Sequence, residues 1–167
     1  MAIALLTLAL VGTVAFLGTI LMGYQIGAGA VTVGRHFAAA LGTTLILVMA
    51  HSFIMFFLIA TGVELKEMEK ERGWGDSFRR RTIAMKGKVF GVMTVALLMV
   101  IAHFVLGAAA HTRAIPMWVH HAMAWATWAV CVLALWREYL VLGDNNRLID
   151  EAAQRRRGAP PSAPHDV

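Results

Sequence analysis

The chain has 167 residues, of which 59% are hydrophobic and only 15% are charged, and its net charge is +5 at neutral pH. A soluble domain carries about 25% charged residues, so this composition indicates that lipid rather than water surrounds most of the chain. The single cysteine, Cys131, excludes an intrachain disulfide, a CxxC redox pair and a zinc site built from thiolates.

Four apolar segments are long enough to cross a bilayer, which takes about 20 consecutive apolar residues. They are residues 2–24, 37–63, 89–110 and 115–135. The first segment lacks the basic start and the short apolar run of a signal peptide, so we expect it to be a span. The sequence therefore predicts an all-α integral membrane protein, an up-down bundle of four transmembrane helices within residues 1–142.

Charged residues gather on one side of this predicted bundle. The loop 64–88 holds eight basic and five acidic residues, and the segment from Arg137 onward holds five of each. The two remaining charged residues, Arg35 and Arg113, lie in the loops on the other side. Because basic loops face the cytoplasm, we expect both termini to be cytoplasmic, in a bacterial inner membrane. We expect the cytoplasmic tail, residues 143–167, to be largely disordered.

The basic loop does not indicate a nucleic-acid site, because acids and bases alternate at helical spacing in the segment ELKEMEKERG. We expect this segment to extend the second span as a helix that ends at Gly73. Lys86 and Lys88 then lead into the third span at the level of the lipid headgroups. In the first span, Gly23 and Gly27 form a GxxxG pair, which allows close helix packing within the bundle or with a partner subunit.

Six of the seven histidines fall within or at the ends of the predicted spans: His36, His51, His103, His111, His120 and His121. With a rise of about 1.5 Å per residue, His51 lies near the midplane of the membrane and the others lie toward its outer side. An ionisable residue inside a membrane indicates a functional site, because an unpaired one is costly to bury.

Imidazoles from different helices at a similar depth are typical of a haem b site, where iron takes two axial nitrogens from facing helices. We expect His121, or its neighbour His120, to supply one ligand. Either His51 or His103 is expected to supply the other, and the sequence does not decide between them.

Haem propionates need cations at the membrane surface, and Arg35 and Arg113 lie at that level. The four spans and the placement of the histidines resemble the small haem-b membrane anchors of respiratory enzymes, which pass electrons between a quinone and a partner. The resemblance implies a cytochrome b-like, haem-binding electron-transfer subunit, a quinone site near the haem edge, and other membrane or periplasmic subunits as partners.

Two other hypotheses remain open. Histidines at the outer mouth could hold copper or zinc facing the periplasm: His36, His111, His120 and His121. We expect every acidic residue to be cytoplasmic, with Glu138 closing the fourth span at the surface, so no carboxylate is expected to support such ligands. The chain could also be an accessory or anchor subunit of a larger complex without a cofactor. No HExxH, GxSxG or Walker motif occurs, so no residue is assigned a catalytic role.

Overall fold

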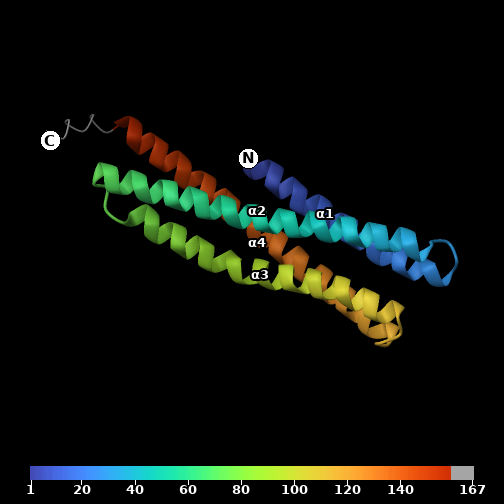
Figure 1. Cartoon of the computed structure of the whole chain (residues 1–167). Coiled ribbons are helices and arrows are strands. Elements are labelled where there is room, and N and C mark those ends of the chain that lie inside the picture. Colours follow the sequence, from blue (N-terminus) through green and yellow to red (C-terminus); the bar gives the residue numbers. More distant parts are fainter. Residues whose placement is uncertain (159–167) are drawn as a thin grey trace.

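The computed structural model of the protein describes residues 1–158 and shows four helices that run in alternating directions (Figure 1). They are α1 (Ala2–Gly27), α2 (Val33–Arg72), α3 (Ser77–His111) and α4 (Met117–Gly158). Each helix is long and apolar enough to cross a membrane. The prediction of an all-helical fold with four candidate spans is therefore confirmed.

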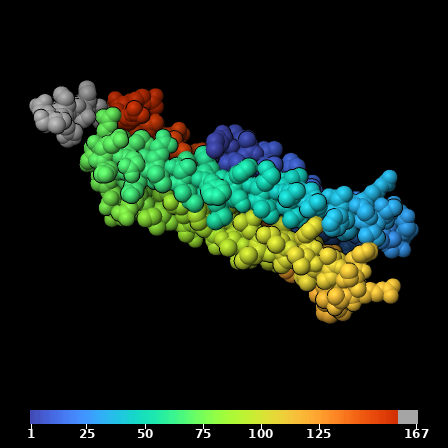
Figure 2. All heavy atoms as spheres, in the orientation of Figure 1, coloured from blue at the N-terminus to red at the C-terminus, as the bar shows by residue number. Residues whose placement is uncertain are grey.

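The helices form an elongated bundle in which consecutive helices are antiparallel neighbours and α1 also packs against α4 (Figures 1 and 2). The α1–α2 and α3–α4 connections lie together at one end, which we name the hairpin end. The α2–α3 connection lies at the opposite end, which we name the terminal end. Since α1 has 26 residues and the other helices have 35 to 42, α2, α3 and α4 continue beyond the N-terminus as a three-helix extension.

Short connections with characteristic turn residues separate the helices. Thr32 precedes α2, and its Oγ1 accepts a hydrogen bond from the backbone nitrogen of Arg35 at 3.4 Å, which caps the helix. Gly73 ends α2 with a φ of +63°, in the left-handed region that favours glycine, as the sequence predicts. Arg113, in the α3–α4 connection, also has a positive φ of +61°.

Helix α4 is longer than the predicted fourth span. The prediction of a disordered tail is wrong for residues 143–158, because they form the last turns of α4. Asn145, Leu148 and Ala152 are buried, and their spacing of three or four residues continues the inward face of the helix. Leu148 and Ala152 belong to a buried cluster with Phe78 of α3. The rest of the predicted tail, residues 159–167, lies outside the described residues.

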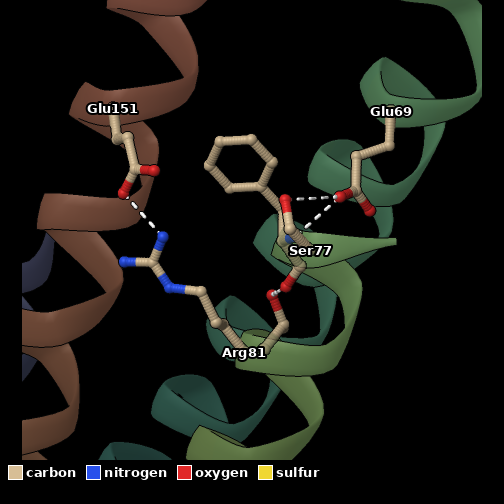
Figure 3. Close-up of polar contacts among 6 residues, drawn as sticks. Glu69, Ser77, Arg81 and Glu151 are labelled. Carbon is tan, nitrogen blue, oxygen red and sulfur yellow. Dashed lines mark hydrogen bonds and ion pairs between the residues drawn. The ribbon is translucent and has the colours of Figure 1, made fainter. Parts of the chain in front are cut away.

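A buried carboxylate joins α2 to α3 in this extension. Glu69 is 3% exposed, and its two oxygens accept hydrogen bonds from the backbone nitrogens of Phe78, at 2.6 Å, and Arg79, at 3.0 Å. These nitrogens belong to the first turn of α3, where free N–H groups and the helix dipole favour an anion. Figure 3 shows Glu69 beside the start of α3, and Arg81 reaching across to Glu151 of α4 at 2.7 Å.

The outside of the bundle is strongly apolar. Large side chains that are 54–70% exposed occur on α2, α3 and α4: Leu45, Phe56, Leu98, Val105 and Trp118. Such a surface is unfavourable in water and compatible with contact with the hydrocarbon of a bilayer. Together with the four long apolar helices, this surface suggests a membrane protein.

Candidate functional site

Four histidines from three helices gather near the hairpin end, and we name them the histidine cluster: His36 of α2, His103 of α3, and His120 and His121 of α4. The rings of His103 and His120 stack with centroids 4.5 Å apart and planes inclined by 6°. The ring of His121 lies 6.1 Å from that of His120. His36 packs against Gly23 of α1, which precedes Tyr24, and the ring of Tyr24 lies 4.6 Å from that of His121.

Aromatic side chains of α1 complete the surroundings of the cluster. The ring of Phe16 meets that of His103 edge-on, with centroids 5.3 Å apart. The ring of Tyr24 lies 4.6 Å from that of His121, and its hydroxyl accepts a hydrogen bond from Nε1 of Trp125 at 3.0 Å. All four helices therefore contribute to this region.

In each helical hairpin, a histidine of the second helix packs against a glycine of the first. A methyl group at Gly23 would lie 3.3 Å from Cε1 of His36, and one at Gly107 would lie 3.1 Å from Cε1 of His120. Both distances are shorter than the usual carbon–carbon contact of about 3.5 Å, so glycine allows the imidazoles to approach this closely. A methyl group at Gly27 would meet no atom within 4 Å, so Gly23 is the glycine of the GxxxG pair that packs inside the bundle.

Three imidazoles of the cluster carry a buried ring nitrogen that has no hydrogen-bond partner within residues 1–158. These atoms are Nδ1 of His36, Nδ1 of His103 and Nδ1 of His120. Leaving a buried polar atom unpaired costs about 1–3 kcal/mol. Three such atoms in one region, each from a different helix, are therefore available to a ligand.

His51 belongs to a different site. Its Nδ1 lies 2.5 Å from Oε1 of Glu138, and both side chains are 0% exposed. The prediction that Glu138 closes the fourth span at the surface is therefore wrong. Glu138 shares the inward face of α4 with Cys131, Ala134 and Val141, which are also buried and three or four residues apart. That spacing is the sequence signal that could have placed this carboxylate inside the bundle.

The histidine cluster and His51 lie far apart along the bundle. Along α2, 15 residues separate His36 from His51, which is about 22 Å at the rise of an α-helix. Along α4, 17 residues separate His121 from Glu138, the partner of His51, which is about 25 Å. The expected pairing of His51 with His121 at one iron is therefore not formed. Measuring depth from the centre of each apolar segment failed because α2 and α4 are offset along the bundle axis.

The other predicted site residues lie at the hairpin end. His103 stacks on His120 rather than on His121, which packs against Tyr24. Arg35 and Arg113 are both exposed there, as expected for cations at a membrane surface. His111, the last residue of α3, is also exposed.

Within residues 1–158, no group of three or more His, Cys, Asp or Glu side chains is arranged as a metal-ion site. The cluster thus offers separate nitrogen ligands rather than a closed coordination shell. No protein-family model, curated protein or solved structure matches this chain.

Proposed function

We propose that this chain is a membrane electron-transfer subunit that binds haem b at the histidine cluster. One observation carries the proposal: unpartnered buried imidazole nitrogens from α2, α3 and α4, within the described residues, meet near one end of an apolar four-helix bundle. Imidazole nitrogens from facing helices are common axial ligands of haem iron. Ionisable groups inside a membrane are costly and usually functional.

The imidazole nitrogens present fit a haem, which His36 and His120 would hold. These residues come from α2 and α4, and each imidazole packs closely against a glycine of the preceding helix. His103 and His120 cannot both ligate one iron between them in their stacked arrangement, since their rings are only 4.5 Å apart and nearly parallel. His103 then supports His120 by stacking.

Residues around the proposed ligands would hold and shield the group. The guanidinium groups of Arg35 and Arg113 would neutralise the propionates at the membrane surface, and Phe16 and Tyr24 would exclude water. Bound haem supplies a one-electron cycle between ferrous and ferric iron. The basic residues of the terminal end favour a cytoplasmic location for that end. An electron partner would then reach the cluster from the periplasmic side or from a neighbouring membrane subunit.

A haem is favoured over a bare copper or zinc ion by the number of ligands that each requires. Haem iron needs one or two protein ligands, whereas structural zinc usually takes four. The described part of the chain holds no group of three such side chains in position. An accessory subunit without a cofactor would leave the three unpartnered Nδ1 atoms without a role.

The proposal is tested by expressing the full chain with an adequate haem supply and recording a reduced-minus-oxidised optical spectrum in detergent. We expect sharp Soret and α bands. His36→Ala and His120→Ala should each remove haem or change the spectrum, because each removes an axial nitrogen. His111→Ala is the matched control, because this exposed histidine lies at the same end and should leave the spectrum unchanged.

Two results would contradict the proposal. One is a flat spectrum from protein with full helical content. The other is haem retained by the double variant of His36 and His120 at wild-type amounts. Copper or zinc bound without a Soret band would favour the bare-ion hypothesis, and the same variants would then identify its ligands.

A further inference from the structure

The His51–Glu138 pair lies isolated among apolar residues. Within the membrane segments around it, residues 2–23 of α1 and 89–102 of α3 contain no ionisable side chain. Residues 37–63 of α2 contain only His51, and 122–136 of α4 contain only Cys131. Arg137, which precedes Glu138 in the sequence, is exposed, and the imidazole of His51 is the group in contact with the carboxylate that can balance its charge.

The charge of the pair depends on a single proton. A neutral imidazole facing a carboxylate leaves one net negative charge in a dry interior, where burying a charge is costly. A proton added at Glu138 gives a carboxylic acid, and one added at His51 gives an imidazolium facing a carboxylate. Both forms are neutral as a pair, so one added proton removes the buried net charge.

Each partner also has one free position at which a proton can be added. Nε2 of His51 and Oε2 of Glu138 are both buried and have no hydrogen-bond partner within residues 1–158. The contact between Nδ1 and Oε1 occupies only the other atom of each group. The pair can therefore take up or release a proton without breaking its own hydrogen bond.

Further polar groups line the same face of α4 on the side of the terminal end. Asn145, seven residues beyond Glu138, is 0% exposed, and its Oδ1 accepts a hydrogen bond from Oγ1 of Thr61 at 3.0 Å. Nδ2 of Asn145 has no partner among the described residues. Beside Thr61, Nζ of Lys86 lies 3.0 Å from the position that a methyl group at Gly62 would take. Asn145 lies about 10 Å from Glu138 along α4, on the side of the charged extension, where an open pocket of about 600 Å³ lies between α2 and α4.

We propose that His51 and Glu138 form a proton-binding site inside the bundle, which exchanges protons with the terminal end by way of Thr61 and Asn145. A proton arriving from that side adds to Oε2 of Glu138 or to Nε2 of His51 and leaves by the same route. The site is separate from the proposed haem ligands, because 15 residues of α2, about 22 Å, separate His51 from His36, and 18 residues of α4, about 27 Å, separate Glu138 from His120. Its test therefore remains valid if the haem proposal fails.

A second buried carboxylate of the chain provides a matched control. Glu69 is also almost fully buried, but backbone nitrogens of α3 donate to both of its oxygens. Both oxygens of Glu69 are therefore occupied by backbone donors. Glu138 differs because one of its oxygens has no donor within residues 1–158.

The test is infrared difference spectroscopy of the full-length protein in liposomes between acidic and alkaline pH. We expect a pH-dependent C=O band of a protonated carboxylic acid that shifts in deuterated water. Glu138→Gln should abolish this band, His51→Gln should shift it, and Glu69→Gln should leave it unchanged. Circular dichroism and size-exclusion chromatography establish that each variant is folded.

The route is tested by the rate at which the band shifts after transfer to deuterated water. Asn145→Leu should preserve the band and slow its exchange several-fold. The proton-binding site is refuted if the wild type has no such band, or if the band survives Glu138→Gln. An unchanged exchange rate in Asn145→Leu refutes the route through Asn145.

Discussion

Replacing His51 by leucine removes the hydrogen bond that Glu138 makes within the described residues and leaves a fully buried carboxylate without a partner. Removing one member of a buried ion pair lowers the free energy of unfolding by about 3–5 kcal/mol, because the remaining charge is uncompensated. Glu138→Leu leaves an unpaired imidazole instead, and an unpaired neutral group costs about 1–3 kcal/mol. Replacing both with leucine removes both polar groups, and apolar replacement of a buried pair is often close to neutral.

We therefore expect the double variant to be more stable than the His51→Leu variant, which reverses the order expected from independent effects. The free energy of unfolding would be measured by titrating detergent micelles with a denaturing detergent and following the loss of helical circular dichroism. Thr127→Val is a suitable control, because Thr127 is equally buried and its hydroxyl has no hydrogen-bond partner within residues 1–158. Two results would contradict the inference that the pair compensates a buried charge. One is a loss of less than about 1 kcal/mol in the free energy of unfolding for His51→Leu. The other is a loss in the double variant that equals the sum of the losses in the two single variants.

Three further predictions concern the ends of the bundle. Glu69→Ala should lower the free energy of unfolding by about 1–2 kcal/mol, as for loss of a helix cap, because Glu69 accepts hydrogen bonds from the first turn of α3. Glu71→Ala changes an exposed position of the same helix and should have little effect. Chemical denaturation measures both variants. Gly107→Ala should displace the imidazole of His120 and change the haem spectrum or lower haem content. Gly91→Ala is the control and should leave the haem spectrum unchanged, because a methyl group there meets no atom within 4 Å. If the Gly107→Ala and Gly91→Ala variants have the same spectrum, the assignment of His120 as a haem ligand is contradicted. Arg81→Ala should lower the free energy of unfolding by at most about 1 kcal/mol, because its ion pair with Glu151 is half exposed. High salt should reduce this difference between the variant and the wild type in the same denaturation assay.

Composition and hydropathy alone predict four apolar helices, because partition into lipid depends on the summed hydrophobicity of about 20 residues and hardly on their order. The end of α2 was also predictable, since Gly73 supplies a left-handed residue directly after a helical charge pattern. The continuation of α4 to Gly158 was missed, because charged residues on the exposed faces of this segment make it as polar overall as a disordered tail.

The assembly of the polar sites depends on how the helices are offset and rotated against one another. Sequence measures the distance between His36 and His51 along α2, but it does not show which residue of α4 lies opposite each of them. The bundle places His120 beside His103, and Glu138 beside His51. These pairings follow from contacts between helices that are distant in sequence, and no pattern within one helix encodes its axial offset from the next.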